Sequence, residues 1–223
     1  MPAETNARAA RAEHILDVAA DLLIRLGYRR VTVDDIADAA DIGKGTIYLH
    51  WKTREALFVA VLLREFLGSM DELTAGLRAD PQAVLLHRIT QAQFRQILRR
   101  PLLRAVYTDD SDVLGKLRTG LQKVLDPRHH SAFEDYLALL AAHGLLREEF
   151  TVSQVSQAFH ATFRGFLLAE DGDADVLGAV IARALEPDGP IPGNQVLQPI
   201  AARAAVLFGE SAAADRAVLH RAY

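Results

Sequence analysis

The stretch TVDDIADAADIGKGTIYLHWKTR, residues 32–54, decides the fold of the N-terminal region. It contains two short segments of helical period, separated by the turn sequence Asp41-Ile42-Gly43. Thr32 is placed to cap the first segment, with Asp35 three positions later as a variant of the capping box. Gly43 can take a positive φ angle in the turn at no steric cost. This pattern predicts a helix-turn-helix, in which one helix crosses a DNA backbone and the other lies in the major groove.

The second predicted helix has an apolar face and a mixed polar face. On a helical wheel of about 100° per residue, Ile47 and Trp51 fall together, which predicts that both face the core. The outward surface is small, polar, aromatic and basic, and we expect its DNA contacts from Lys44, Gly45, Thr46, Tyr48, Leu49, His50 and Lys52.

Each of these outward residue types has a physical use at a DNA surface. Gly45 lets the backbone approach DNA closely, and a helix N-terminus favours a phosphate. Tyr48 and His50 have the length and the donors to reach the DNA backbone. Lys44 and Thr46 can reach base edges.

Charge is polarised across this motif rather than spread over the chain. The chain has 25 basic and 29 acidic residues and a net charge of −4, so its composition alone does not indicate nucleic acid. Residues 42–54 contain three cations and no carboxylate, whereas residues 32–41 contain four carboxylates. A local basic face can still meet phosphates while the rest of the domain stays acidic.

The motif has two other interpretations. The sequence GKGT at 43–46 is not a Walker A loop, because Asp38 stands where its first glycine is needed and Gly45 follows Lys44 where Ser or Thr is needed. A merely structural helical hairpin stays open, but it does not explain why Gly, Thr, Tyr, His and Lys cluster on one surface.

At these residues the chain resembles the TetR family of bacterial one-component regulators. The pattern is a first helix that ends at Gly27-Tyr28, then residues 32–51, then KTREALF at 52–58. The resemblance is specific over about residues 11–60. It implies an Ω-shaped all-α homodimer with two DNA-binding heads and C-terminal ligand-binding bodies. It also implies DNA contacts from Thr32, Lys44, Gly45, Thr46, Tyr48, His50 and Lys52.

Two positions depart from the family pattern. Trp51 stands where Phe is usual, which is a conservative exchange in a core. Leu49 stands where an aromatic residue or His is common, and the wheel aims this large aliphatic side chain at solvent. Leu49 is either an ordinary exposed leucine or a contact for the C5-methyl groups of thymine in the groove.

Helical periodicity continues through the rest of the chain, so the predicted fold class is all-α. We expect a DNA-binding head at residues 8–56 and a helical ligand-binding and dimerisation body at 57–186. A Pro/Gly-rich linker and a C-terminal helical extension follow at 187–223, where Gly209 is predicted to separate two helices.

Proline and cap residues mark several predicted helix starts. Thr53 caps a long helix at about residues 54–77, and Pro81 and Pro101 stand at later helix starts. Asp112 and Ser153 are predicted N-caps.

The predicted body is rich in aromatic residues at helical spacing, which suits either a core or the lining of a ligand pocket. Our candidate ligand-binding residues are His87, Phe94, Tyr107, Phe133, Tyr136, His160, Phe163 and Arg164. Arg164 either pairs with a carboxylate, meets an anionic ligand or extends to solvent, which is the ordinary behaviour of a long cationic side chain.

A homodimer is expected because one recognition helix reads few base pairs, whereas a two-fold dimer reads a palindromic operator. The family resemblance assigns the interface to the last two helices of the body, at about 153–170 and 174–185. The candidate interface residues are Val155, Phe159, Phe166, Val176 and Val180.

Several kinds of chemistry are not supported by the sequence. The chain has no cysteine, which excludes disulfides and thiolate metal sites, and His129-His130 lacks accompanying metal ligands. No nucleophile elbow or dinucleotide fingerprint occurs, so we predict no catalytic residue, no metal and no cofactor. The first residues contain no apolar run and no stretch approaches about 18 apolar residues, so we expect a cytoplasmic protein without a signal peptide or membrane span.

The sequence therefore predicts a DNA-binding transcriptional regulator, with a double-stranded DNA operator and a small, largely apolar effector as partners. We expect a repressor that the effector releases from DNA. One alternative is a DNA-binding dimer without a small-molecule effector, controlled by abundance or by a protein partner. The other is a helical enzyme or carrier in which the N-terminal motif is incidental.

Overall fold

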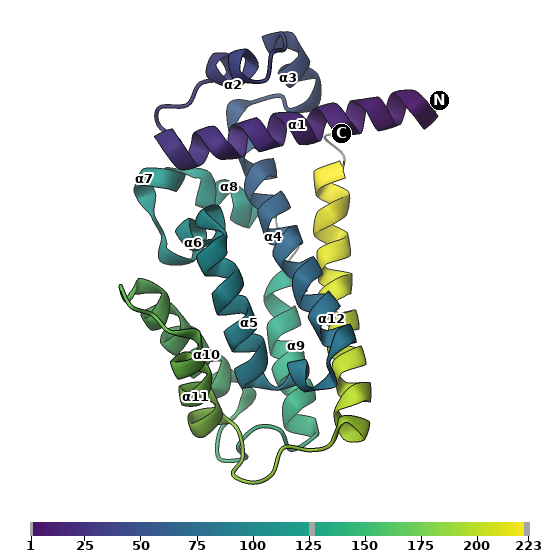
Figure 1. The fold of residues 1–223 in the computed structure, drawn as a ribbon, viewed down its shortest axis with the longest axis vertical. Helices are drawn as coiled ribbons and strands as arrows, with labels where there is room; N and C mark the ends of the chain where they lie inside the picture. The colour runs from purple at the N-terminus through teal and green to yellow at the C-terminus, as the bar shows by residue number, and fades with distance from the viewer. Residues whose placement is uncertain (1, 125–127, 221–223) are drawn as a thin grey trace. The chain divides into compact units, whose positions relative to one another are not determined.

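A computed structural model describes residues 2–124 and 128–220, and side chains are described for 7–124 and 131–220. Every regular element within these ranges is a helix (Figure 1). The all-α prediction is confirmed.

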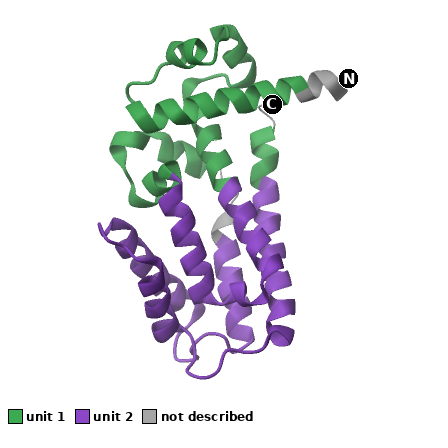
Figure 2. Cartoon of the chain, viewed as in Figure 1, with its two compact units in different colours: residues 1–67, 101–125, 215–223 green, residues 68–100, 126–214 purple. Residues whose placement is uncertain are grey.

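The chain divides into two compact units, and each unit is assembled from separated segments (Figure 2). Unit 1 comprises residues 1–67, 101–125 and 215–223, and unit 2 comprises residues 68–100 and 126–214. The three consecutive domains expected from the sequence are a different division of the chain, and they stay a prediction.

The N-terminal part of unit 1 begins with four helices: α1 (Pro2–Leu26), α2 (Val33–Ala39), α3 (Lys44–His50) and the first half of α4 (Arg54–Ala79). Helix α1 ends because Gly27 takes a φ of 73°. A Cβ atom on Gly27 would lie 2.5 Å from the backbone oxygen of Asp112, so only glycine fits this end of the helix.

Three further helices belong entirely to unit 1: α6 (Pro101–Thr108), α7 (Ser111–Leu114) and α8 (Leu117–Val124). Residues 215–220, at the end of α12, also belong to it. Helix α1 lies between α2 on one side and α6 and α7 on the other (Figure 1). One sequence prediction needs correction here: the N-cap of α7 is Asp110 rather than Asp112. Gly115, whose φ is 52°, ends α7 before α8 begins.

Unit 2 is built around α5 (Leu86–Arg99), which packs along α11 (Ala174–Leu185) (Figure 1). Close approach of these helices depends on Gly178, because a Cβ atom there would lie 2.5 Å from Nε2 of Gln91. The remaining elements of unit 2 are the second half of α4, the 3₁₀ helix η1 (Pro81–Val84), α9 (Arg128–Ala142), α10 (Val152–Leu168) and most of α12 (Asn194–His220).

Two expectations about helix boundaries in the C-terminal half are wrong. Helix α10 is capped by Thr151 rather than Ser153, since Thr151 and Gln154 form a complete capping box. Helix α12 continues through Gly209. A glycine inside a helix costs only about 1 kcal/mol, and α12 offsets it with a long buried stripe that includes Leu197, Ala204 and Phe208.

Candidate nucleic-acid interface

The start of α2 is organised by the predicted capping box. The backbone N–H of Asp35 donates to Oγ1 of Thr32 at 3.2 Å, and the backbone N–H of Thr32 donates to Oδ2 of Asp35 at 2.7 Å. The Thr32 hydroxyl also donates to Oδ2 of Asp35. These hydrogen bonds, first from the Thr32 side chain and then from its backbone, lower the pKa of Asp35.

The turn between α2 and α3 uses a different residue from the one predicted. Asp41 takes the positive φ angle, 51°, whereas Gly43 is extended at φ −71° and serves as the N-cap of α3. Aspartate tolerates this left-handed conformation better than most residues, because its short side chain can bond locally. The backbone N–H of Ile42 donates to the carbonyl of Ala37, which closes the turn.

The inner face of α3 agrees with the helical wheel. Ile47 is fully buried and Trp51 is 3 % exposed, as predicted. The backbone N–H of Trp51 donates to the carbonyl of Ile47 and ends the helix. The indole N–H of Trp51 is buried without a hydrogen-bond partner among the described residues, which a phenylalanine would avoid.

The outer face of α3 presents four of the predicted residues to solvent: Lys44, Gly45, Tyr48 and Leu49. Leu49 is 69 % exposed and Tyr48 is 38 % exposed. A side chain at Gly45 would meet no protein atom within 4 Å, so packing inside the protein does not require glycine there. Thr46 is half-buried. Thr32, the N-cap of α2, and Lys52, which follows α3, are both exposed.

His50 is a correction to the predicted outward set. It is only 9 % exposed, and its ring lies 5.2 Å from that of Trp51. The physical reason is its position: three residues after Ile47, it lies about 60° from the inward direction on a wheel of about 100° per residue. His50 therefore packs at the end of α3.

Arg54 also differs from the expectation of a basic face at residues 42–54, because its side chain points into the protein. Its guanidinium lies 4.1 Å from the ring centroid of Tyr28. It also donates to the carbonyl oxygens of Tyr28 at 3.0 Å and Val31 at 2.5 Å. Arg54 thus fastens the connection before α2 to the start of α4, whose cap Thr53 accepts from the N–H of Ala56 as predicted.

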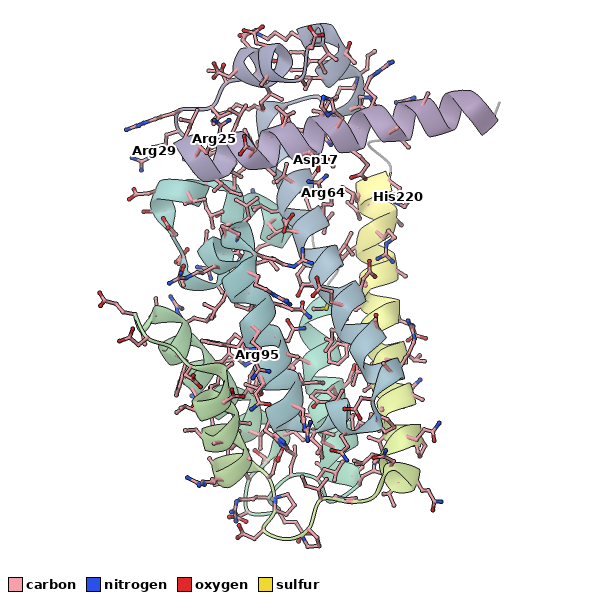
Figure 3. All side chains as sticks on the ribbon, viewed as in Figure 1. Asp17, Arg25, Arg29, Arg64, Arg95 and His220 are labelled. Atoms are coloured by element: carbon pink, nitrogen blue, oxygen red, sulfur yellow. The ribbon has the colours of Figure 1, made fainter. Side chains whose placement is uncertain are left out.

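A further cation holds α1 against α4 within unit 1. Arg64 on α4 lies 3.0 Å from a carboxylate oxygen of Glu13 and 2.7 Å from one of Asp17, both on α1. Figure 3 labels Arg64 and Asp17, which meet below α1. No sequence motif signals this pair, because the partners are more than 40 residues apart.

Five of the candidate ligand-binding residues lie close together in unit 2. Their ring contacts form a continuous series: Phe94–Phe163 at 5.8 Å, Phe133–Tyr136 at 6.0 Å and Phe133–His160 at 5.2 Å. Phe159 joins the two halves, with centroids 4.6 Å from Phe133 and 5.5 Å from Phe163. Phe208 of α12, which the sequence reasoning missed, lies 5.4 Å from Tyr136. We use the name aromatic cluster for these seven residues: Phe94, Phe133, Tyr136, Phe159, His160, Phe163 and Phe208.

The polar edges of the aromatic cluster are already bonded within the protein. The Tyr136 hydroxyl is buried and donates to the carbonyl of Val84 at 2.7 Å. Burial first, and the negative charge of Glu186 second, raise the pKa of Tyr136 well above its ordinary value. Nδ1 of His160 lies 2.8 Å from the carbonyl oxygen of Ser156, one turn earlier in α10.

The other three ligand candidates lie outside the cluster. Nδ1 of His87 lies 2.7 Å from Oε2 of Glu186, and the His87 backbone N–H donates to the same carboxylate. Tyr107 belongs to α6 in unit 1, which removes it from this group of residues. Arg164 is exposed, in agreement with a side chain that extends to solvent.

The candidate interface residues fall into two classes. Val176 and Val180 on α11 are 54 % and 39 % exposed, and Phe166 is half-buried. Val155 and Phe159 are buried in unit 2, so their assignment to an interface is corrected: they are core residues of one chain.

The described residues offer no group of three or more His, Cys, Asp or Glu side chains able to hold a metal ion. The side chains of His129 and His130 lie outside the described residues. Among the described helices, none combines the length and the apolar character that crossing a membrane requires.

The head of the chain is similar to known proteins. Residues 15–61 match the family model of bacterial regulatory proteins of the tetR family. This N-terminal segment is therefore similar to the DNA-binding head of the TetR family. The chain is 40 % identical over 67 residues to the transcriptional repressor KstR2 of Rhodococcus jostii (strain RHA1), a match that covers 30 % of the chain and only 32 % of that repressor.

A longer match reaches beyond the head of the chain. KstR2 of Mycolicibacterium smegmatis is 26 % identical over 198 residues, which cover 85 % of the chain and 86 % of that repressor. The solved structure of a SmeT–triclosan complex shares the fold, with a TM-score of 0.64 at 22 % identity over 82 % of this chain and 96 % of the other. The matched family and these relatives are transcriptional regulators, not enzymes, and they support a DNA-binding transcriptional regulator here.

Proposed function

We propose that this protein is a ligand-responsive repressor, which binds a palindromic operator as a homodimer and is released by a small, largely apolar effector. The observation that carries the proposal is the outer face of α3. Lys44, Gly45, Tyr48 and Leu49 are exposed there, while Ile47 and Trp51 anchor the helix to unit 1.

The DNA-binding part rests on how this face is supported. A recognition helix must present side chains to base edges and phosphates without weakening its own packing. The capping box at Thr32 sets the start of α2, and Arg54 holds the preceding connection. The exposed residues of α3 are therefore carried on a rigid support, which favours precise contacts.

The homodimer is supported by an apolar surface on α10 and α11. Leu168, Val176 and Val180 are all exposed there, although large aliphatic side chains are usually buried. Two heads related by a two-fold axis would read half-sites about 34–36 Å apart, or one turn of DNA. Size-exclusion chromatography with light scattering should give a dimer, and Val176→Glu with Val180→Glu should shift it toward the monomer.

The effector part rests on the aromatic cluster of unit 2. Its rings come from α5, α9, α10 and α12, and most of its members are buried, so an occupant would meet mainly apolar surface. An effector acts only through its differential affinity for the DNA-binding and released states. Helix α4 belongs in part to each unit, which makes it one of the covalent links through which such a shift would pass.

The decisive experiment is selection of bound DNA from a random duplex pool. The expected result is an enriched inverted repeat that the protein binds with strong salt dependence. Absence of any enriched sequence would contradict the proposed function. Sites found upstream of genes would then nominate the class of effector.

A second experiment separates an effector-controlled repressor from a DNA-binding dimer without effector. Thermal unfolding is measured against a panel of apolar and amphipathic small molecules, because a ligand that binds only the folded state raises its stability. A true effector should also release operator DNA, and Phe133→Ala should reduce both responses. A panel that moves neither unfolding nor DNA binding would favour the alternative.

A further inference from the structure

The N-terminal ends of α2 and α3 are joined by one ion pair. Nζ of Lys44 lies 2.8 Å from Oδ2 of Asp34. Lys44 is the first residue of α3, and Asp34 stands in the first turn of α2. Their side chains are 47 % and 63 % exposed, so the pair is open to solvent at the start of α3.

Asp34 is the carboxylate available for this contact because its neighbour is committed elsewhere. Oδ2 of Asp35 accepts the backbone N–H and the hydroxyl of Thr32 in the capping box. The hydrogen bond to Asp34 in turn raises the pKa of Lys44, so the ammonium stays charged while it is paired.

When DNA binds, the carboxylate of Asp34 and a DNA phosphate compete for the ammonium group of Lys44. A lysine ammonium is a compact charge on a flexible stem, and phosphates of any DNA sequence attract it. A phosphate that reaches Lys44 must displace the carboxylate of Asp34 or accept its repulsion. On an operator, Lys44 can instead donate to a neutral base acceptor, which does not repel the carboxylate of Asp34. Nonspecific binding depends almost entirely on phosphate contacts, so it loses more from this competition than operator binding.

We propose that Asp34 is a specificity-determining residue, whose carboxylate competes with DNA phosphates for Lys44 and thereby suppresses binding to nonoperator sequences. The inference rests on the proposed DNA-binding function. It assigns a role to a residue outside the outward set of α3.

The test compares Asp34→Asn with the parent protein on the selected operator and on a scrambled duplex, over a series of salt concentrations. Asp34→Asn should tighten binding to the scrambled duplex by about three- to tenfold and change operator binding less. The slope of log K against log salt on the scrambled duplex should steepen by about 0.9, the value for one more neutralised phosphate.

Asp38→Asn is the matched control, because it removes the same charge from an exposed position of α2. It should leave the ratio of operator to scrambled binding near that of the parent. In a Lys44→Gln background, Asp34→Asn should no longer change this ratio, which ties the effect to the pair rather than to net charge.

Three results would overturn the inference. Asp34→Asn would weaken binding to both duplexes if the carboxylate instead orients Lys44 for a productive contact. It would act equally with and without Lys44, or no differently from Asp38→Asn, if only net charge mattered. Thermal unfolding of each variant checks that the fold is retained. If the parent protein enriches no DNA sequence, the proposed function itself is wrong. That outcome can be distinguished from a failure of the Asp34 inference alone, in which the parent still selects an operator.

Discussion

The helix pair α2–α3 and the aromatic cluster of unit 2 use their side chains in opposite ways. In α3 the residues predicted to act on a partner are exposed, and neighbours within about ten positions organise them. In the aromatic cluster the predicted residues are mostly buried, and contacts between helices far apart in the chain bring them together.

Because of this difference, a substitution in the head can change binding without changing stability, whereas a substitution in the aromatic cluster of unit 2 changes both. An exposed residue such as Tyr48 can be replaced at little cost to folding, because it buries little surface. A buried residue such as Phe94 cannot, since its removal leaves a cavity. Variants of α3 therefore report on binding, whereas cluster variants need a stability control before a loss of ligand response is interpreted.

The largest effect is expected from Trp51→Ala. Trp51 is buried in unit 1 at the end of α3, so its truncation should cost roughly 3–5 kcal/mol of unfolding free energy. Chemical denaturation measures this directly.

Trp51→Phe is the matched control for that variant. The indole N–H has no hydrogen-bond partner among the described residues, so the phenylalanine removes a buried polar group while it keeps most of the packing. The unfolding free energy should stay within about 1.5 kcal/mol of the parent. If Trp51→Ala cost as little as Trp51→Phe, the core assignment of this residue would be wrong.

In unit 2, Tyr136→Phe should cost about 1–3 kcal/mol, because the buried carbonyl of Val84 loses its donor. Denaturant titration of both proteins gives the difference. Tyr48→Phe, the same change at an exposed tyrosine, should be nearly neutral. Equal costs at the two sites would remove the distinction between buried and exposed tyrosines.

The same buried tyrosine predicts a dependence on alkaline pH. Burial, and secondarily Glu186, raise the pKa of Tyr136 above the ordinary value of 10.0, so the folded state favours the protonated phenol. The corresponding stability is fully present below pH 10 and decreases as the pH rises through and above it. Denaturant titrations from pH 9 to 11 should show a steeper loss for the parent than for Tyr136→Phe, and parallel losses would contradict this.

Tyr48→Ala and Lys44→Ala should weaken operator binding by about tenfold each, or about 1.4 kcal/mol, with the unfolding free energy within about 0.5 kcal/mol of the parent. Both side chains are exposed on α3, so the loss should appear only in binding. Fluorescence anisotropy with labelled operator measures the affinity. Unchanged affinity in both variants would remove α3 from the role of recognition helix.

The smallest change in affinity is expected from Leu49→Ser. Leu49 is the most exposed large apolar side chain of α3 and would contact thymine methyl groups through its aliphatic atoms. Selection from a random pool should return a motif altered at one or two base pairs, while the total affinity changes little. An unaltered motif would make Leu49 an ordinary exposed leucine.

Local patterns in the sequence were sufficient for much of the head. Thr32 and Asp35 cap α2, Thr53 caps α4, and Ile47 and Trp51 form the inner face of α3, all as predicted. Each of these depends on hydrogen bonds or helical period within about four residues, and such short-range geometry is visible in the order of the amino acids.

Other features needed the tertiary structure. From the sequence, Arg54 is expected to be one more cation of a basic face. In the structure its guanidinium instead contacts the ring of Tyr28 and donates to the carbonyl of Val31. Gly209 reads as a helix break, yet the buried face of α12 carries the helix through it.

What the sequence by itself determined about this protein is its all-α class, the resemblance of its head to the TetR family and the helix-turn-helix with most of the outward face of α3. Only the tertiary structure decided which side chains are free to meet a partner. It buried His50, paired Lys44 with Asp34 and gathered Phe94, Phe163 and Phe208 into one unit. The reason is that burial and pairing depend on which helices come into contact. The residue pattern within one helix does not show which other helices pack against it.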